Sequence, residues 1–360
     1  MIQDIRLQNF RSYKDDTFEF GSGVNIIVGP NASGKTNLLE SLLAVSLGSS
    51  YRVATKGLVR FDKPWARLEA HTDHGQRILK LENIETGIKR TYEIDGRQFS
   101  RLSLNKTIPV VLFEPEHLRL LSGSPERRRD YLDDLLEQTT PGYTSLRSSY
   151  KRTLAQRNAL LKRNPIQASS QLFAWNIRLS ELGDQIAQAR HNLVNQIAKQ
   201  ISPIYTKLAG SKMKISLTYS GSCPITNYGS HMLKQLEANT DFDFSRGFTS
   251  HGPHRDDMQL LMNGHAAHEV ASRGEVRTML LCLKIVELGL LEAVRGQKPL
   301  LLLDDVFSEL DGKRRQFLTS FLSNHQTFIT TTDADVVVQH FMDNCTIIPT
   351  SSGPTTPAKS

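Results

Sequence analysis

The segment Gly29–Thr36, "GPNASGKT", has the residue types and the spacing of a phosphate-binding loop. It fits the pattern G-x-x-x-x-G-K-[ST], and it stands between an apolar run at 24–28 and a stretch at 35–47 with apolar residues at helical spacing. Glycines at both ends let the backbone curl so that successive N–H groups face phosphate oxygens. In such a loop the lysine reaches the β- and γ-phosphates, and the Ser/Thr hydroxyl binds Mg²⁺. The sequence therefore predicts a site for ATP and Mg²⁺ formed by Gly29, Pro30, Asn31, Ala32, Ser33, Gly34, Lys35 and Thr36.

Two adjacent carboxylates end another apolar run, "LLLLDD" at 300–305. A buried strand that ends in this way places both acids at its carboxyl edge, where ligands bind in open α/β sheets. We expect Asp304 to hold the hydrated Mg²⁺, and Asp305 to accept a hydrogen bond from the attacking water and orient it toward the γ-phosphate. The two acids could also simply end a strand and begin a turn. Because a phosphate-binding loop is present as well, we favour the catalytic interpretation, with Asp305 and Lys35 as the catalytic residues.

A Ser-Arg-Gly-Glu sequence at 272–275 opens a long apolar run. Ser272 and Glu275 fit a capping box, in which each side chain bonds a backbone N–H of the first helical turn. The same helix start could also bind a phosphate. In ABC-type ATPases a helix that starts with S-x-G-[QE] contacts the γ-phosphate held by the other subunit, and a D-loop follows the acidic strand. We therefore expect both roles, with the trans motif at Ser272, Arg273, Gly274 and Glu275 and the D-loop at Ser308 and Asp311.

The overall composition limits the class of protein. The chain has 360 residues and a formal charge of +7, which favours a polyanionic partner. No apolar stretch approaches the ~18 residues that a membrane span requires, and the charged N-terminus resembles no signal peptide. Three widely spaced cysteines indicate free thiols of a reducing compartment, with neither a metal site nor a disulfide framework.

The hydrophobic pattern changes along the chain. Residues 66–99 alternate and contain the turn pairs Thr86-Gly87 and Asp95-Gly96, which predicts antiparallel sheet. From Pro125 to about Leu208 the patterns are helical only, with a break at Pro165, which favours an inserted antiparallel hairpin of helices. The alternative is that these helices belong to the main core. Strand-like patterns return near 257–262 and continue to "QTFITTT".

These observations predict an α/β fold: a P-loop ABC-type ATPase head, with a mixed sheet and an antiparallel subdomain, and an inserted α-helical domain. The ATPase domain is expected at 1–113 and 242–350. The inserted helical domain is expected at 114–241, and a disordered tail at 351–360.

The chain resembles the RecF family of bacterial recombination mediators, which is related to the heads of SMC proteins. The resemblance runs through "LQNFRSY", "GPNASGKTNLLE", "FEPEHLRLLSGSPERRRDYLD", "KRTLAQRNALLK", "HGPHRDD", "SRGE" and "LLLLDDVFSELD", so it covers nearly the whole chain. It implies that the discontinuous ATPase domain has two lobes. It also implies an ATP-dependent homodimer that clamps double-stranded DNA near ss/ds junctions or gaps and works with RecR and RecO to load recombinase. It further implies a slow ATPase activity that DNA stimulates, with roles in replication restart and SOS induction. The protein is then expected in the cytoplasm, associated with the nucleoid and without a membrane partner.

The same resemblance places further residues. Arg11 and Ser12 fall near the adenine, and Arg52 falls in an arginine-bearing loop after the P-loop helix; for both arginines the alternative is a solvated surface charge. His251 and His254 lie in a family hallmark, and the sequence assigns them no reaction. Two departures stand out. Many ABC ATPases carry Glu at the position of Asp305, so slow turnover is expected, and the switch-loop histidine after "FITTT" is missing.

The segment 147–163 contains six basic residues and no acidic one. On a helical wheel most of the basic residues lie away from the apolar stripe, so the apolar face can pack while the basic face meets solvent. We expect this face to contact duplex DNA phosphates, although a charge run is often only a solvated face. The DNA-binding candidates are Arg147, Lys151, Arg152, Arg157, Lys162 and Arg163.

Two other functions are compatible with a nucleotide-binding loop. One is the ATPase subunit of an ABC-type transporter, against which the basic composition, the helical insertion and the missing switch histidine all count. The other is a DNA-binding module with a structural nucleotide, which the pair Asp304 and Asp305 argues against.

Overall fold

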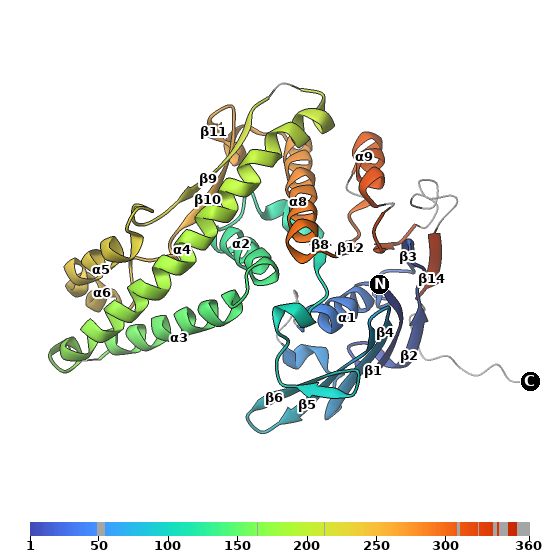
Figure 1. The fold of residues 1–360 in the computed structure, drawn as a ribbon, viewed down its shortest axis with the longest axis horizontal. Coiled ribbons are helices and arrows are strands. Elements are labelled where there is room, and N and C mark those ends of the chain that lie inside the picture. The colour runs from blue at the N-terminus through green and yellow to red at the C-terminus, as the bar shows by residue number, and fades with distance from the viewer. Residues whose placement is uncertain are drawn as a thin grey trace, which may run out of the picture. The chain divides into compact units, whose positions relative to one another are not determined.

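The chain folds into two compact units (Figure 1). The computed structural model describes residues 1–48, 55–163, 165–211, 213–307, 310–322, 324–333, 337 and 345–350. The first unit contains Met1–His117 and Leu288–Ser360, and the second contains Leu118–Glu287. Residues 242–287 thus belong to the second unit, whereas the sequence analysis groups them with the ATPase domain. The expected tail at 351–360 lies outside the described residues.

A six-stranded sheet forms one layer of the first unit, with the strand order β2-β1-β4-β5-β6-β7 and antiparallel pairing throughout. Asp95 and Gly96 both have positive φ, 48° and 77°, as a tight two-residue hairpin turn requires. The antiparallel sheet predicted for 66–99 is therefore confirmed. The strands are β1 (Ile2–Phe10), β2 (Tyr13–Glu19), β4 (Trp65–Thr72), β5 (Gly75–Ile84), β6 (Gly87–Ile94) and β7 (Arg97–Phe99).

A five-stranded parallel sheet forms a second layer, with the order β14-β3-β13-β12-β8. Every residue of β12 and β13 is buried, as expected of parallel strands covered on both faces. Gln326 links the two sheets, because its side chain accepts a hydrogen bond from the Ile2 N–H and donates one to the Ile2 carbonyl. The strands are β3 (Val24–Val28), β8 (Val110–Phe113), β12 (Leu300–Asp304), β13 (Thr327–Thr331) and β14 (Cys345–Pro349).

Helix α1 (Lys35–Leu47) packs against both sheets. Its residues Leu38, Leu39 and Leu42 belong to one hydrophobic core with side chains from strands of both layers. The helix ends at Gly48, which has a left-handed φ of 75° and donates its N–H to the Ala44 carbonyl. The loop before α1 therefore stands on a rigid, buried support. The other described helical segments of this unit are η1 (Thr55–Leu58), η2 (Leu104–Lys106), α9 (Gly312–Leu322), part of η3 (Pro115–Arg119) and the part of α8 (Arg273–Arg295) that follows Glu287.

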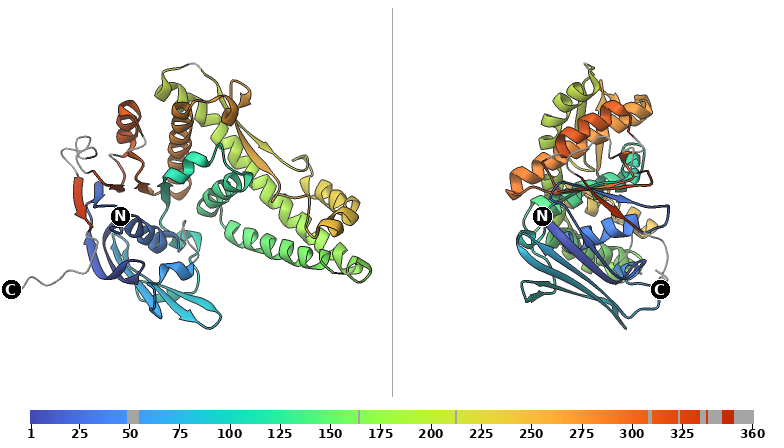
Figure 2. Two further views of the ribbon diagram at one scale, coloured as in Figure 1. Left: turned by 180° about the vertical axis from the view of Figure 1, so that it is seen from behind. Right: turned by 90° about the vertical axis from the view of Figure 1, so that its right-hand side faces the viewer.

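The second unit is built on long helices, α2 (Pro125–Thr139), α3 (Tyr143–Leu161) and α4 (Pro165–Ala209). Helices α3 and α4 run side by side as a hairpin, which Figures 1 and 2 show from both sides. The buried face of α4 contains Leu179, Leu182 and Ile186, as its apolar spacing predicts. The helical hairpin expected from the sequence is therefore present, in a unit separate from the two-sheet core.

A three-stranded antiparallel sheet, β11-β10-β9, and shorter helices complete the second unit. Asn263 and Gly264 form the tight turn between β10 and β11, with φ values of 51° and 86°. Strands β2, β9 and β14 and helices α5 and α6 are not predicted by the sequence pattern. None of the described helices is long and apolar enough to cross a membrane. The remaining elements are β9 (Ile215–Ser220), α5 (Tyr228–Ala238), α6 (Thr240–Arg246), β10 (Asp257–Met262), β11 (His265–Ala266), α7 (Ala267–Val270) and α8 (Arg273–Arg295).

Candidate nucleotide-binding site and DNA surface

The loop Gly29–Gly34 connects the carboxyl end of β3 to the first turn of α1. Ala32 and Gly34 have left-handed φ values of 65° and 100°, so the loop folds back on itself. A Cβ at Gly29 would lie 2.5 Å from the Thr350 carbonyl oxygen, and only glycine fits there. Because glycine is also the N-cap of α1, no side chain caps the helix. Its first-turn N–H groups are those that bind phosphate in such loops.

The Lys35 ammonium lies over this loop. Its Nζ donates hydrogen bonds to the carbonyls of Gly29, at 2.7 Å, and Pro30, at 2.8 Å. Burial lowers the pKa of Lys35, and the charges of Asp305 and Asp304 act in the opposite direction. A phosphate chain bound at the loop would meet this cation and would strengthen its protonated form. The donor set therefore fits a polyphosphate.

Thr36 and Asp304 provide the oxygen ligands that Mg²⁺ prefers. The Thr36 hydroxyl donates to Oδ1 of Asp304 at 3.0 Å, so the two side chains predicted to hold the metal are adjacent. Among the described residues, no group of three or more His, Cys, Asp or Glu side chains is arranged so that it could hold a metal ion by itself. A metal here would therefore share its coordination with phosphate oxygens and water, which suits Mg²⁺ and not a cage made of protein ligands alone.

Asp305 follows directly after β12 and has a left-handed φ of 52°. Asp and Asn adopt this region more readily than other side chains. Its N–H donates to the Thr330 hydroxyl at 2.9 Å. The structure thus brings Lys35, Thr36, Asp304 and Asp305 to one edge of the parallel sheet, as the sequence predicts.

Two residues outside the motif hold the loop in place, and sequence analysis missed both. The buried Tyr13 donates its hydroxyl to the Gly34 carbonyl at 3.0 Å. Thr350 donates its N–H and its hydroxyl to the Val28 carbonyl, so the Ser33 hydroxyl, 2.7 Å away, donates to Thr350. Tyr13 begins β2 and Thr350 follows β14, two strands without a hydrophobic pattern, so no local signal points to either role.

Arg11 and Ser12 lie beside α1. The Arg11 guanidinium pairs with the fully buried Glu40 at 2.7 Å and donates to the Gly57 carbonyl. The Ser12 hydroxyl accepts a hydrogen bond from the Asn37 amide at 2.9 Å. Arg11 is therefore not a freely solvated charge, and its contact with adenine remains a prediction. Arg52 lies outside the described residues.

The predicted capping box at the start of α8 is confirmed. The Ser272 N–H and hydroxyl both donate to Oε2 of Glu275, and the Glu275 N–H donates back to the Ser272 hydroxyl at 3.3 Å. Hydrogen bonds from Ser272 lower the pKa of Glu275. Ser272 and Arg273 are exposed, while Gly274 is half-buried. The helix start is thus preformed, and its role toward a second subunit remains a prediction.

The D-loop is described only in part. Ser308 lies outside the described residues. Asp311 accepts the Arg314 N–H at 3.0 Å and pairs with the Arg314 guanidinium, so it caps the first turn of α9.

Two of the six DNA-binding candidates are placed where they cannot meet a phosphate. Arg157 is fully buried, and its guanidinium contacts Asp243 at 2.7 Å, Thr249 and Asn176. Arg147 is 13% exposed and is surrounded by Asp130, Asp133, Asp134 and Glu137. The DNA prediction is wrong for these two arginines, because each neutralises carboxylates within the fold. Lys151, Arg152, Lys162 and Arg163 are exposed.

The segment around His251 and His254 is a structural junction. The Tyr150 hydroxyl lies 2.7 Å from Nδ1 of His254, and Nε2 of His254 lies 3.0 Å from the Thr249 carbonyl. His251 contacts the Ser250 hydroxyl through Nδ1. Burial lowers the pKa of His254 to about 4, so the ring is neutral at physiological pH. The contact with Tyr150 holds the segment against α3. His254 therefore has a structural role, and no reaction is assigned to it.

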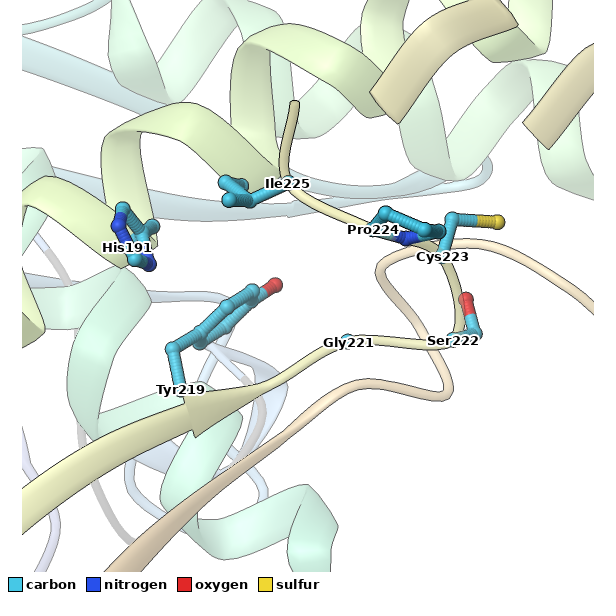
Figure 3. Close-up of a pocket in the computed structure, with 7 residues that line it drawn as sticks. All are labelled: His191, Tyr219, Gly221, Ser222, Cys223, Pro224 and Ile225. Carbon is cyan, nitrogen blue, oxygen red and sulfur yellow. The ribbon is translucent and has the colours of Figure 1, made fainter. Parts of the chain in front are cut away.

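The second unit also contains an open cavity of about 400 Å³, shown in Figure 3. His191 and Tyr219 form one wall, and Gly221–Ile225 form the other. The Tyr219 hydroxyl is bound to the buried Asp256 at 2.6 Å. None of the lining residues is a predicted site residue. The hydrogen bond from Tyr219 to Asp256 gives the tyrosine a structural role.

Comparison with known proteins gives a consistent result. A family model described as RecF/RecN/SMC N terminal domain matches residues 1–353. The chain is 39% identical over 343 residues to the DNA replication and repair protein RecF of Heliobacterium modesticaldum, with 92% of each chain covered. It is 37% identical over 348 residues to the protein of the same name from a Streptococcus pyogenes strain, with 94% of each covered.

Solved structures agree with the sequence relatives. A structure described as the recombination mediator protein RecF-ATP in the RecFOR pathway has a TM-score of 0.84 and 31% identity, with 92% of each chain covered. An SMC head domain from Pyrococcus furiosus, at 16% identity, 98% and 94% coverage and a TM-score of 0.52, shares the fold alone. The matched relatives are DNA replication and repair proteins, so a transporter subunit is not favoured. The chain therefore belongs to the RecF family of RecF/RecN/SMC ATPases.

Proposed function

We propose that this chain is an ATP-dependent DNA-binding protein of replication and recombinational repair. The proposal rests on the position of four side chains. Lys35, Thr36 and Asp304 lie at one edge of the parallel sheet, and Asp305 directly follows Asp304. The RecF relatives are named for DNA replication and repair, and a solved neighbour is described with ATP. Together these observations support an ATPase that couples ATP binding and hydrolysis to DNA binding.

Each residue of the site has a defined task. The P-loop N–H groups and Lys35 hold the phosphate chain, and the hydroxyl of Thr36 and the carboxylate of Asp304 would hold Mg²⁺. A metal ion held by these two residues would neutralise charge that develops on the phosphate oxygens. Asp305 accepts a proton from water and orients its oxygen toward the γ-phosphate. Because Asp is one methylene shorter than the Glu of many ABC ATPases, we expect the water to be held less closely and turnover to be slow.

ATP is expected to join two copies of the chain. Ser272 at the start of α8 would contact the γ-phosphate bound by the other copy, together with the N–H groups of that helix start. In the structure the Ser272 hydroxyl donates to Glu275, so it would exchange one negatively charged acceptor for another. Ser308 and Asp311, the adenine-side residues Arg11 and Ser12, and Arg52 of the arginine-bearing loop after the P-loop helix would complete the proposed nucleotide environment.

The exposed basic face of α3 and the turn after it is the proposed DNA surface. Lys151, Arg152, Lys162 and Arg163 would contact backbone phosphates of double-stranded DNA, with gaps and ss/ds junctions as the biological targets. Phosphate contacts carry no sequence information, so binding is expected to tolerate any sequence. DNA stimulation of the ATPase, partnership with RecR, RecO and a recombinase, roles in replication restart and SOS induction, and a cytoplasmic, nucleoid-associated location are part of this proposal.

The test is nucleotide-dependent DNA binding. Fluorescence anisotropy of a labelled gapped duplex is recorded with the protein and ATP, ADP or no nucleotide, each with Mg²⁺. We expect the protein to bind the duplex tightly with ATP, and weakly with ADP or without nucleotide. Lys35→Ala should lose the tight binding. Equal affinity under all three conditions, or retention of ATP-dependent binding by Lys35→Ala, would contradict the proposal.

A further inference from the structure

Thr330 connects the two acidic residues at the end of β12. Its hydroxyl donates to Oδ1 of Asp304 at 2.7 Å and accepts the Asp305 N–H at 2.9 Å. Thr330 lies on β13, the strand between β3 and β12, and it is the register partner of Asp304. Its side chain is 1% exposed. One buried hydroxyl therefore contacts both the carboxylate predicted to hold Mg²⁺ and the backbone of the predicted base.

The chemistry of the partners fixes the direction of both hydrogen bonds. A backbone N–H can only donate, and an ionised carboxylate can only accept. The single proton of the Thr330 hydroxyl must therefore point to Asp304, while a lone pair receives the Asp305 N–H. Asp304 Oδ1 thus receives two hydroxyl donors, from Thr330 and from Thr36, which hold the plane of the carboxylate.

The end of the sheet explains why a side chain is required here. The ladder between β12 and β13 ends at the pair Asp304 and Thr330, and Asp305 turns away with a φ of 52°. Its N–H therefore lies beyond the regular backbone ladder, and the Thr330 hydroxyl supplies the acceptor. An aliphatic side chain of the same shape at 330 would fill the same space and supply neither hydrogen bond.

We propose that Thr330 is a positioning residue of the ATPase reaction, which sets Asp304 and Asp305 relative to each other. It acts through these two acids and need not touch ATP itself. Hydrogen bonds to a ligating carboxylate typically support metal affinity or activity by about 10- to 100-fold. The inference rests on the proposed ATPase function, so its test needs a readout in the protein without nucleotide.

The variants are chosen to separate this role from general strand stability. Thr330→Val keeps the shape and removes the hydroxyl, while Thr330→Ser keeps the hydroxyl and removes a methyl group. Thr327→Val is the matched control, because Thr327 is fully buried on the same strand and donates its hydroxyl only to the His325 carbonyl. Only the first variant removes a contact with the acidic pair.

The first measurement is hydrogen exchange of the Asp305 amide in protein without nucleotide, followed with overlapping peptides. Loss of one hydrogen bond should speed that exchange about fivefold or more in Thr330→Val. The rate should stay unchanged in Thr330→Ser and Thr327→Val. Equal exchange in Thr330→Val and the parent would overturn the proposed contact, whether or not the protein hydrolyses ATP.

The second measurement follows metal and turnover. Mn²⁺ binding with a non-hydrolysable ATP analogue, read from the EPR signal of free Mn²⁺, should weaken about tenfold in Thr330→Val. The kcat for ATP should fall by a similar factor, the KM for the metal–ATP complex should rise because the metal is held less tightly, and Thr330→Ser should restore both quantities. A Thr327→Val variant with the same losses, or a Thr330→Ser variant without recovery, would overturn the positioning role. A parent protein that bound no ATP would instead contradict the proposed function.

Discussion

Thr36 and Asp304 lie 268 positions apart in the chain, and the threonine hydroxyl donates to the aspartate Oδ1 at 3.0 Å. Strand β3 leads into the loop before Thr36, β12 ends at Asp304, and β13 alone separates these two strands in the sheet. Because all three strands are parallel, their carboxyl ends reach the same edge. A phosphate-binding loop and an acidic pair from opposite ends of the sequence thus form one site.

Replacing Lys35 should remove ATP binding. Lys35→Ala deletes the ammonium that donates to the loop carbonyls of Gly29 and Pro30, so the phosphate charge loses this partner. A hydrogen bond to a charged group contributes about 1.5–3 kcal/mol, so affinity should fall at least tenfold. Titration with a fluorescent ATP analogue measures this. Unchanged affinity in a folded variant would show that the loop does not bind the phosphates.

Asp305→Asn should stop hydrolysis and leave binding intact. Asparagine tolerates the φ of 52° and keeps the side-chain shape, while the carboxylate that accepts a proton from water is lost. A general base contributes about 10²- to 10⁴-fold, so phosphate release should fall by at least about 100-fold. An enzyme-coupled phosphate assay and an ATP titration give the two numbers. Parental turnover in this variant would place the base elsewhere.

The exposed basic residues of the second unit should control duplex binding. Lys151→Ala, Arg152→Ala, Lys162→Ala and Arg163→Ala together should flatten the slope of log K against log salt by about one unit per lost phosphate contact. A charge-matched control removes four exposed cations of the first unit, Lys14, Lys63, Lys89 and Arg97. Anisotropy with ATP across a salt series measures both variants. A flatter salt slope in the control variant alone would place the DNA-binding surface on the first unit.

Arg157 should behave differently from its exposed neighbours. Arg157→Ala leaves Asp243 buried without its cation, which typically costs about 3–5 kcal/mol of stability. We therefore expect a large fall in the denaturant midpoint, whereas Arg152→Ala should leave the midpoint nearly unchanged. Equal midpoints for the two variants would contradict the buried ion pair.

His254 should make the stability of the protein depend on pH. Its pKa is about 4 in the folded chain and about 6.5 in an unfolded one, so the neutral ring stabilises the fold fully above pH 6.5. That contribution is lost as pH falls toward 4. Between pH 7 and pH 5 this residue should lower the free energy of unfolding by about 2 kcal/mol. Urea unfolding of the parent and of His254→Gln at both values should show a smaller pH effect in the variant. Identical pH effects would contradict the neutral buried ring.

The sequence predicts the parts of this structure that depend on local patterns. The P-loop, the acidic strand, the capping box of Ser272 and the hairpin of helices all have local signals, and the structure contains each of them. Strand β2 was missed because Tyr13 is its only buried residue, so its pattern does not alternate. Helical spacing also cannot reveal that Arg157 meets Asp243, since that carboxylate lies 86 residues away. Thr330 was missed for the same reason, because its role depends on the neighbouring strand.

We expect ATP to join two copies of the chain through the Ser272 helix start, and the mass of the protein in solution measures this. Light scattering of the parent with Mg²⁺ should show a dimer with ATP and a monomer with ADP or without nucleotide. Ser272→Arg should remain a monomer with ATP yet still bind fluorescent ATP, while Ser272→Thr, which keeps the helix cap, should form the dimer. A parent whose mass is the same in all three conditions, or a Ser272→Arg variant that forms the dimer with ATP, would show that ATP does not join two copies through this helix start.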